Sequence, residues 1–509
     1  MNLRKGLLIM CCLGLLMGMV GCAEKEVQGG KEIDTDVNKP NADKDKDAYV
    51  FVSEGNSAYR LNPQTGGADK EADALREAIM NATDDLDTSG GTVYYISSLS
   101  GDDKNEGTSP EKAWCTLSAY TKNKKLLKAG DTVLFERGGV YRGGDNVPLI
   151  SGVTYGAYGS GAKPAIYGSR KNYSGEGSWK KTDMENVWVC NEYVVSDVGV
   201  IVFNHGQAVG IKRLGEGETL EENLAELQAN FEFYHDLGNA KLYLYLDHDP
   251  SETFYDIEIC EKGNILKGAS GCKDVTIDNL SIKYGGGHAI RFDENASHIV
   301  ITNCEIGFMG GSIQNGTTRY GNGIEFWNGC SDILVENNWI YQIYDAGFTH
   351  QGGDVGGYVQ EDITLRSNLV EYCCYSLEFY VGNSAEDLMK NVLYEGNIVR
   401  FAGYGWGMVR PDPMAVGAIN AWGFQDAFRT ENFVIKDNIF DMSARSLIVQ
   451  YYKEGLDITY TGNSYYLKEG NVAIWKGQEL LTAEDQKTME ESVAVIDKNP
   501  KTVQFIQQQ

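Results

Sequence analysis

One eight-residue pattern recurs seven times in the second half of the chain and restricts the folds open to it. Each copy is a short alternating strand, a polar bend and a second short strand, and successive copies begin 24 to 41 residues apart. The sixth position holds Leu280 and Cys304 in the first two copies and asparagine in the other five. The copies read VTIDNLSI (275–282), IVITNCEI (299–306), ILVENNWI (333–340), ITLRSNLV (363–370), VLYEGNIV (392–399), FVIKDNIF (433–440) and ITYTGNSY (458–465).

The five asparagines, Asn338, Asn368, Asn397, Asn438 and Asn463, predict an asparagine ladder. In such a stack each side-chain amide bonds to its neighbours and satisfies backbone groups at an inward bend. Leucine-rich repeats also carry a periodic asparagine, but they need a leucine scaffold that this chain lacks. The pattern therefore predicts an all-β fold, a right-handed parallel β-helix in which each turn of chain, or rung, stacks on the one before it.

Composition agrees with this fold and narrows the partners. Sixty glycines and thirty tyrosines against nine prolines suit many short strands joined by tight turns. The formal net charge of −27 argues against a nucleic-acid partner and disfavours polyanions in general. The cysteines beyond the N-terminus are scattered and show no Cys/His spacing typical of zinc, so we expect buried free thiols and no metal site. No feature predicts self-association, and we expect a monomer.

The N-terminus predicts the compartment. The stretch MNLRKGLLIMCCLGLLMGMVGC has a basic start, an apolar run too short to span a membrane, and the small residue Gly21 before Cys22. This junction resembles that of bacterial lipoproteins, which implies a signal peptide over residues 1–21 and acylation of Cys22. Residues 22–48 are polar and predict a disordered tether. We therefore expect a protein of the cell envelope, lipid-anchored on the outer face of a bacterial membrane and touching it through that lipid only.

The rest of the chain divides into four parts. We expect an N-terminal cap and the first rungs over residues 49–185, a small β-rich insertion over 186–258, the main β-helix over 259–475 and a C-terminal tail over 476–509. In the first part, KEADALREAIMNA (70–82) places Leu75, Ala78, Ile79 and Ala82 on one helical face. We expect this capping helix to plug the open end of the solenoid and shield its strand edge.

Three further stretches carry a family resemblance. SGDDKNEGTSPEKAWCTL (100–117), AGDTVLFERGGVYRG (129–143) and GVTYGAYGSGAKPAIYGS (152–169) resemble the first rungs of carbohydrate-active β-helical proteins in the pectate-lyase-like superfamily. The antiparallel pattern of the insertion, with one short helix at 219–227, is similar to inserts in β-helical glycoside hydrolases such as the family containing α-fucosidases and xylanases. The resemblance implies the scaffold, and on it a polysaccharide or oligosaccharide substrate.

The strand that follows each bend predicts the functional face. By the period of two, six residues point into the core: Ile290, Ile324, Phe348, Leu377, Ile419 and Leu447. The next residues share an outward, solvent-facing column: Arg291, Glu325, Thr349, Glu378 and Asn420. The column beyond it holds Asp293, Trp327, Gln351, Tyr380 and Trp422. Glycine-rich insertions at 309–321, 351–360 and 404–417, the last carrying Arg410, border this face, which suits sugar binding.

Three carboxylates on this face are candidate catalytic residues. Adjacent rungs lie roughly 4.8 Å apart, so Glu325 and Glu378, two rungs apart, have backbones separated by about 10 Å. That separation fits inverting glycosidases better than retaining ones. Asp345 begins the rung between them and can pair with either glutamate. The hypothesis is a surface-anchored glycoside hydrolase that uses paired-carboxylate acid/base catalysis and needs no cofactor.

Two alternatives stay open at this point. A polysaccharide lyase or uronate epimerase on the same scaffold needs a cationic or histidine base, for which Arg291, Arg410 and His350 are candidates, and often calcium. His350 nominally points inward by the alternation, unless the glycines after it turn the strand toward the site. A non-catalytic glycan-binding surface protein would explain the aromatic residues without paired carboxylates.

Overall fold

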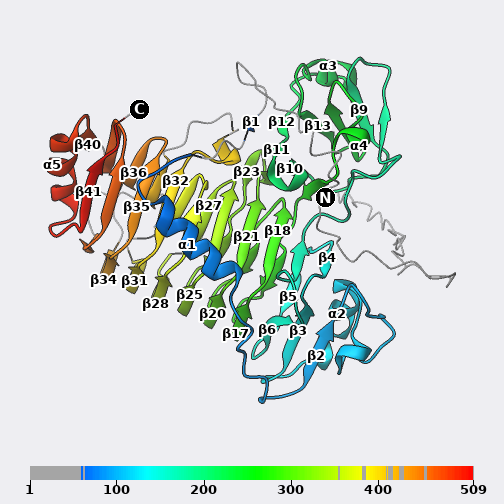
Figure 1. Cartoon of the computed structure of the whole chain (residues 1–509), viewed down its shortest axis with the longest axis horizontal. Coiled ribbons are helices and arrows are strands. Elements are labelled where there is room, and N and C mark those ends of the chain that lie inside the picture. The colour runs from blue at the N-terminus through cyan, green and yellow to red at the C-terminus, as the bar shows by residue number, and fades with distance from the viewer. Residues whose placement is uncertain are drawn as a thin grey trace, which may run out of the picture. The chain divides into compact units, whose positions relative to one another are not determined.

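The computed structural model describes residues 59–60, 64–352, 356–380, 384, 386–408, 410, 416–422, 429–451, 456–477 and 479–507. The signal, Cys22 and the tether lie outside these residues. Strands met in order along the chain visit three ten-stranded sheets in turn, and each strand pairs in parallel with its counterparts in the rungs before and after it (Figure 1). One example of this register is Ile290 beside Ile324 and Ile324 beside Phe348. The fold is the predicted right-handed parallel β-helix.

The three sheets form the sides of the solenoid, and only the last pair of the first sheet, β39 with β40, is antiparallel. The first sheet contains β5 (Val147–Leu149), β16 (Leu266–Gly268), β19 (Ile290–Phe292), β24 (Ile324–Trp327), β27 (Ala346–Gln351), β30 (Tyr375–Tyr380), β33 (Gly417–Trp422), β36 (Ser446–Gln450), β39 (Gly470–Trp475) and β40 (Glu479–Ala483). The second contains β2 (Val93–Ile96), β3 (Thr132–Glu136), β6 (Thr154–Tyr158), β17 (Lys273–Asp278), β20 (Ser297–Thr302), β25 (Ser331–Glu336), β28 (Val359–Arg366), β31 (Leu388–Glu395), β34 (Arg429–Lys436) and β37 (Ile458–Thr461). The third contains β4 (Val140–Arg142), β7 (Ala165–Tyr167), β18 (Ser281–Gly285), β21 (Glu305–Met309), β26 (Trp339–Ile343), β29 (Leu369–Glu371), β32 (Ile398–Ala402), β35 (Ile439–Ser443), β38 (Ser464–Leu467) and β41 (Thr502–Phe505).

The asparagine ladder runs along the bend between the second and third sheets. Asn338 donates from both its backbone N and its Nδ2 to Oδ1 of Asn368, each at 3.0 Å, and Asn368 repeats this toward Asn397. Every Nδ2 also reaches a backbone carbonyl of the preceding rung, so each amide is fully used. The stack ends on Asp497, whose Oδ2 accepts from Asn463 N and Nδ2 at 3.1 and 3.0 Å. The ladder prediction is confirmed.

The core lies between the three sheets and is filled by their inward columns. Ile290, Ile324, Phe348, Leu377 and Ile419 occupy one column of the first sheet, as predicted, and all are fully buried. In the last rung of this column the register places Ile448, not Leu447, beside Ile419. The alternation counted along the earlier rungs is therefore one residue out of register with this strand. The eight cysteines in the described part of the chain are free and buried, as expected.

Helix α1 (Asp69–Met80) forms where it was predicted but does not plug an end. Its apolar face, Ala72 with Leu75 and Ile79, packs on Leu369 and Ile398 of the third sheet (Figure 1). The ion pair between Arg76 and Glu371 fixes it there at 2.8 Å, as does a second pair between Asp69 and Arg400. Amphipathic spacing shows that one face is buried, but it does not show against which surface. The helix therefore shields one side of the solenoid.

Two other helices cover the ends of the core. At the first rungs, α2 (Leu117–Asn123) buries Leu117 and Tyr120, and the Tyr120 hydroxyl lies 3.0 Å from that of Tyr155. At the other end, α5 (Gln486–Ile496) inserts Met489 and Val493 into the same core. The expected C-terminal tail is thus a folded cap with β40 and β41. Short helices η1 (Pro110–Lys112), η2 (Lys124–Leu126) and η4 (Trp406–Met408) complete the solenoid; no described helix is long and apolar enough to span a bilayer.

The insertion forms two small sheets with a core of its own. One sheet has the order β12–β13–β14–β9–β8 and the other β1–β11–β10–β15, so the unit extends beyond 186–258 to residues 179 and 261 and also includes the distant strand β1. Thr219 caps α3 through a reciprocal capping box, which explains the short helix expected there. The elements are β1 (Tyr59–Arg60), β8 (Trp179–Lys181), β9 (Val187–Cys190), β10 (Val198–Phe203), η3 (Asn204–Gly206), β11 (Ala208–Val209), β12 (Ile211–Arg213), α3 (Leu220–Ala225), β13 (Glu232–Asp236), β14 (Lys241–Tyr245), α4 (Pro250–Thr253) and β15 (Ile257–Glu261).

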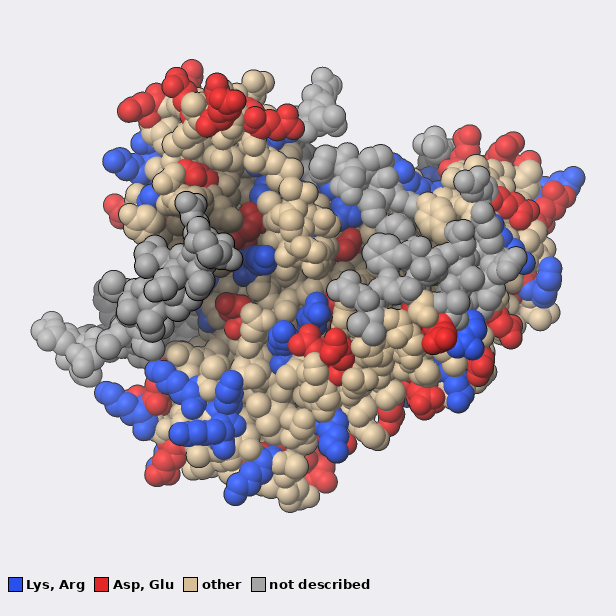
Figure 2. Space-filling model, turned by 180° about the vertical axis from the view of Figure 1, so that it is seen from behind, with Lys and Arg blue, Asp and Glu red and all other residues tan. Residues whose placement is uncertain are grey.

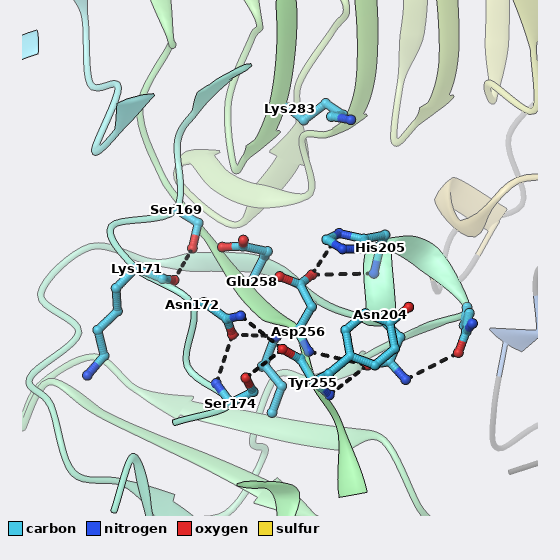
Figure 3. Close-up of polar contacts among 12 residues, drawn as sticks. Ser169, Lys171, Asn172, Ser174, Asn204, His205, Tyr255, Asp256, Glu258 and Lys283 are labelled. Carbon is cyan, nitrogen blue, oxygen red and sulfur yellow. Dashed lines mark hydrogen bonds and ion pairs between the residues drawn. The ribbon is translucent and has the colours of Figure 1, made fainter. Parts of the chain in front are cut away.

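A polar network ties the root of the insertion together. Asn172 donates to Tyr255 O and accepts from Ile257 N, each at 3.0 Å, and Asp256 lies 3.2 Å from Nδ1 of His205 (Figure 3). Glu258, on β15, meets Arg142 of the first rungs through two bonds of 2.6 and 2.7 Å. Burial raises the pKa of Glu258 to about 7 although Arg142 opposes the shift. These contacts hold the insertion firmly against the solenoid.

Charge is unevenly spread over the described surface. Exposed acids gather at and just before α3 in the insertion, at Glu216, Glu218, Glu221 and Glu222, where Figure 2 shows a red end on the insertion lobe. Exposed lysines gather around α2 and η2, at Lys122, Lys124, Lys125 and Lys128, on the lobe of the first rungs. Between the two lobes the surface is hollowed, and side chains of both charges line the hollow (Figure 2).

The ladder predicts a difference between two asparagine-to-alanine variants. Asn397→Ala would remove the oxygen that accepts from the backbone N and Nδ2 of Asn368, and the Nδ2 that donates to the carbonyl of Leu365, at a cost of about 1 to 3 kcal/mol in the free energy of unfolding. Asn499→Ala, at an exposed position, should leave stability almost unchanged. Urea denaturation measures both, and equal stabilities would contradict the ladder's energetic role.

Candidate active site

Glu325 lies on the outer face of the first sheet but is buried. Its strand pairs Arg291 with Glu325 on one side and Glu325 with Thr349 on the other, which confirms the predicted column. Oε1 accepts a hydrogen bond from Nη1 of Arg291 at 2.8 Å, and Oε2 accepts one from Nδ2 of Asn322 at 2.7 Å. Nδ1 of His288 lies 2.8 Å from Oε2. Only 1% of Glu325 is exposed, so neighbouring side chains cover the glutamate that was expected to face solvent.

Opposing effects set the pKa of Glu325. Burial raises it, because the charged form loses hydration, but His288 and Arg291 beside the carboxylate lower it more strongly. The hydrogen bond from Asn322 acts in the same direction, and together they lower the pKa to about 2. Glu325 is therefore ionised over the whole physiological range. A carboxylate in this state suits a base or nucleophile rather than a proton donor.

Asp345 occupies the next rung and has the opposite tendency. Burial raises its pKa; Arg410 and His288 oppose the shift without cancelling it, and the charge of Glu325 adds to it. Nη1 and Nη2 of Arg410 lie 3.4 and 3.3 Å from Oδ1 of Asp345. The Asp345 side chain keeps 18% exposure, against 2% for that of Glu325. Two neighbouring carboxyl groups whose pKa values are pushed apart are the usual arrangement for dividing acid and base roles.

The segment before β24 links the two carboxyl groups. The carbonyl of Gly321 accepts from the backbone N of Asp345 at 3.3 Å. The side chain of Asn322 then bridges the pair: its Nδ2 donates to Glu325, while its Oδ1 accepts from the backbone N of Ala346 at 2.9 Å. The position of Asp345 relative to Glu325 thus depends on two consecutive residues, Gly321 and Asn322.

Glu378 lies one rung beyond Thr349 and two rungs from Glu325. Its Oε2 accepts hydrogen bonds from Oγ1 of Thr349 at 2.7 Å and from Nε2 of Gln351 at 2.9 Å. The two-rung separation corresponds to about 10 Å between backbones, as expected from the sequence. The charge of Glu325 acts on the pKa of Asp345, which makes Asp345 a carboxyl partner of Glu325.

The predicted substrate-binding residues divide into two groups. Around Glu325, Arg291 donates from Nε to Asp293 at 2.9 Å and lies over the ring of Trp327 at 5.4 Å. Around Glu378 lie Gln351, Tyr380 and Asn420, and Asn420 is the register partner of Glu378 on the next strand. Burial and the charge of Glu378 raise the pKa of Tyr380 to about 12. Trp422 pairs with Tyr380, but its side chain lies outside the described residues. Arg410 pairs with Asp345 and lies 4.2 Å over Tyr344.

His350 requires a correction, because it lies inside the solenoid. It is fully buried, its Nε2 lies 2.7 Å from the Tyr394 hydroxyl, and its ring neighbours are Phe348 and Phe379. Burial lowers its pKa to about 3, which keeps the imidazole neutral. The strand keeps its alternation through Gln351, so the glycines after it do not turn His350 toward the outer face. A substrate-binding role for His350 is not compatible with this position.

The sequence reasoning missed three residues at the centre of the site: His288, Tyr320 and Asn322. The alternation assigns positions 288 and 322 to the core, since each precedes an inward isoleucine by two residues. Both lie at the bend where the strand begins, and there the chain turns their side chains toward Glu325. Tyr320 lies at the end of a glycine-flanked insertion, with its ring 5.9 Å from that of His288. The one sequence signal for Tyr320 was its place in the glycine-rich insertion 309–321, which borders the predicted face.

Within the described ranges, no group of three or more His, Cys, Asp or Glu side chains is placed to hold a metal ion.

Comparisons with known proteins give a short sequence match and structural matches of low identity. No family model matches the chain. A lacto-N-biosidase of Bifidobacterium longum subsp. longum is 47% identical over 51 residues, which are 10% of this chain and 3% of that enzyme. Among solved structures, a protein described as a glycoside hydrolase covers 81% of this chain and 96% of its own, with 10% identity and a TM-score of 0.39. Pectate lyase Pel9A covers 80% and 86%, with 11% identity and a TM-score of 0.42.

A GH136 lacto-N-biosidase from Eubacterium ramulus matches 86% of this chain and 69% of its own, with 12% identity and a TM-score of 0.29. The structural matches thus include glycoside hydrolases and polysaccharide lyases. Their low identities and TM-scores leave the reaction to be argued from the site itself.

The depressed pKa of Glu325 predicts a pH-dependent contribution to stability. A carboxyl group with a lowered folded-state pKa stabilises the fold fully above its ordinary pKa of 4.5, and this stabilisation is lost as the pH falls toward 2. Glu325→Gln should therefore be less stable than the parent at pH 7, by on the order of 3 kcal/mol, and the difference should shrink between pH 5 and pH 2.

Thermal melting across that pH range measures the effect. Glu469→Gln, at an exposed position, serves as the matched control and should follow the parent at every pH. A stability difference for Glu325→Gln that stays constant down to pH 2 would argue against an ionised, paired Glu325.

Proposed function

We propose that the protein is a glycoside hydrolase in which Glu325 is the ionised carboxylate and Asp345 the protonated acid. The observation that carries the proposal is the opposite pKa displacement of two carboxyl groups on adjacent rungs, joined through Gly321 and Asn322. Neither group is an ordinary surface acid. His288 and Arg291 keep Glu325 ionised, while burial and the charge of Glu325 raise the pKa of Asp345 against the opposing effect of Arg410.

In this mechanism Asp345 donates its proton to the leaving glycosidic oxygen as the bond to the anomeric carbon breaks. Glu325 either attacks that carbon or removes a proton from the water that attacks it. Glu378, two rungs from Glu325, is then assigned to substrate binding with Gln351.

The proposed substrate is a neutral oligosaccharide or polysaccharide. Trp327 offers an aromatic face at the edge of the site, and Asp293 and Gln351 offer hydrogen-bonding groups for sugar hydroxyls. A uronate-rich substrate is disfavoured, since Arg291 already pairs with the carboxylate of Glu325, Arg410 lies against Asp345, and Glu325 remains negatively charged. The short match to a lacto-N-biosidase makes a lacto-N-bioside a sensible member of any substrate panel.

The carboxylate pair predicts the kinetics of three variants. Residues 49–509 would be screened against aryl glycosides, a lacto-N-bioside and neutral plant polysaccharides. On the glycan that the parent cleaves, Glu325→Gln and Asp345→Asn should each lower kcat by roughly 10²- to 10⁴-fold, because each removes one acid/base partner. Glu378→Gln should mainly raise KM. The parent should stay active well below pH 4, and Asp345→Asn should remove the alkaline limb of the pH profile.

Product analysis separates the alternatives. Released reducing sugar without new ultraviolet absorbance supports hydrolysis. An unsaturated, absorbing product would instead mean a lyase and would overturn the proposed chemistry, and binding without turnover would favour a glycan-binding protein. Near-parental activity in both Glu325→Gln and Asp345→Asn would also remove the basis for the proposed pair.

We also propose that the chain is a lipoprotein anchored through Cys22 to the outer face of a bacterial membrane. The support is the short apolar run followed by Gly21 and Cys22. Expressed in a bacterium, Cys22→Ala should move from the membrane fraction to the soluble fraction, because the acyl chains would supply the anchor. Membrane retention of the variant would reject this proposal.

A further inference from the structure

The hairpin that precedes β24 joins the insertion to the catalytic pair. It consists of β22 (Ser312–Asn315) and β23 (Thr318–Tyr320), which pair with each other in an antiparallel arrangement. Gly310 and Gly311 stand at its start and Gly321 at its end, all with positive φ that a larger residue would adopt only under strain. The base of the hairpin, directly before Asn322, is narrow: Gly311 N donates to the carbonyl of Tyr320 at 3.3 Å, and a Cβ atom at Gly310 would lie 2.5 Å from the carbonyl oxygen of Gly321.

The insertion clamps the first strand of this hairpin. Asp197 accepts a hydrogen bond from the backbone N of Ile313 at 2.6 Å, and both its oxygens receive Nζ of Lys212, at 2.6 and 2.7 Å. The side chains of Asp197 and Lys212 are only 6% and 3% exposed, so this ion pair is buried. A charged pair out of water is held by its full set of partners, and Ile313 of the hairpin is one of them. The pair thus makes the hairpin part of the insertion's own polar interior.

Close backbone packing and one arginine complete the clamp. A Cβ atom at Gly199 would lie 2.1 Å from the carbonyl oxygen of Gly310, so the two backbones meet with no room for a side chain. Arg319 donates from Nε to the carbonyl of Gly311 at 2.6 Å and from Nη2 to that of Gly199 at 3.3 Å. Its guanidinium lies 4.9 Å over Tyr344, which precedes Asp345 in the chain. Both strands of the hairpin are therefore fixed to the insertion.

The other end of the hairpin reaches both carboxyl groups of the proposed pair. Tyr320 is half-buried beside His288, and burial together with the charges of Glu325 and Asp345 raises its pKa. The next residue, Gly321, holds the backbone of Asp345, and the one after it, Asn322, holds Glu325. The insertion is in turn fixed at its root through Arg142 and Glu258 and the network of Figure 3. A continuous set of contacts runs from the solenoid through the insertion and back to the active site.

We infer that the insertion is part of the catalytic machinery: Asp197 is a positioning residue that holds the β22–β23 hairpin, so that Tyr320 contacts the substrate and residues 321–322 set the Glu325–Asp345 geometry. The inference rests on the proposed hydrolase function. It gives the insertion a role distinct from an independent binding module, since its buried ion pair acts on the reaction through the hairpin.

Hydrogen exchange tests the clamp without any glycan. Asp197→Asn keeps the shape of the side chain but removes the charge that binds Lys212 and Ile313. Amides of residues 311–322 should then exchange about tenfold faster, because the hairpin opens locally. Glu232→Gln is the matched control: it removes the charge of another buried carboxylate of the insertion, which pairs with Arg213, the residue after Lys212 on β12. Unchanged exchange at 311–322 in Asp197→Asn overturns the clamp.

Kinetics on the glycan that the parent cleaves tests the link to catalysis. Tyr320→Phe and Asp197→Asn should each lower kcat/KM by about tenfold, and the double variant should lose little more than the worse single variant, because both act through one group. Glu232→Gln should keep the parental kcat/KM. Fully additive losses, or a parental Tyr320→Phe, overturn the inference.

The activity of Glu325→Gln tests the hydrolase proposal independently of the clamp variants. If Glu325→Gln also remains active, the hydrolase proposal fails, whatever the clamp variants show. If Glu325→Gln is inactive while Tyr320→Phe and Asp197→Asn are not, the hydrolase proposal stands and only the role of the insertion is wrong. Should Asp197→Asn not fold, Tyr320→Phe alone still decides whether the end of the hairpin contributes to turnover.

Discussion

Backbone pairing between successive rungs is the interaction on which the rest of this structure depends. A parallel rung contributes side chains to an interior bounded by three sheets, and every bend must satisfy its own backbone groups because the interior excludes water. The asparagine ladder meets this need along one bend by using both ends of each amide. With the bends fixed, residues on consecutive rungs stand in register at one strand spacing. Side chains far apart in sequence, such as Arg291, Glu325 and Thr349, therefore lie side by side.

The same regular spacing explains how the site divides its charges. The bends before β24 and β27 bring Asp345 close enough to Glu325 for the charge of Glu325 to raise the pKa of Asp345, and the supporting side chains are shared unequally. His288 and Arg291 each lie 2.8 Å from the carboxylate of Glu325, whereas Arg410 lies 3.3 Å from Asp345, whose pKa stays raised. Burial alone would have raised both pKa values. The placement of three cationic or titratable partners, more than the carboxyl groups themselves, is what differentiates the pair.

Much of the fold could be predicted from the sequence because its signals are periodic. The position of each ladder asparagine, the core column from Ile290 to Ile419 and the outward column with Glu325 all follow from counting residues along aligned repeats. Counting failed where the period is interrupted. Strand starts turned His288 and Asn322 toward the site, and the last rung shifted the column from Leu447 to Ile448. The apolar face of α1 was predictable, but its partner, the third sheet, was not, since amphipathic spacing carries no information about the surface that it meets. The pKa of Glu325 was equally beyond sequence, because it depends on neighbours from other rungs.

The end of the ladder on Asp497 has a consequence for how the chain is completed. A stack of asparagines has no intrinsic end, because its last member still presents N–H donors to which the asparagine oxygen of a further rung could bond. Here that amide meets a carboxylate at the C-terminal end of α5, a group that resembles the asparagine oxygen but offers no donor to pass the pattern on. During synthesis the growing solenoid therefore exposes unpaired donors at the end of the ladder until residues 486–497 have emerged. Only when these residues dock can the ladder no longer pair with another chain.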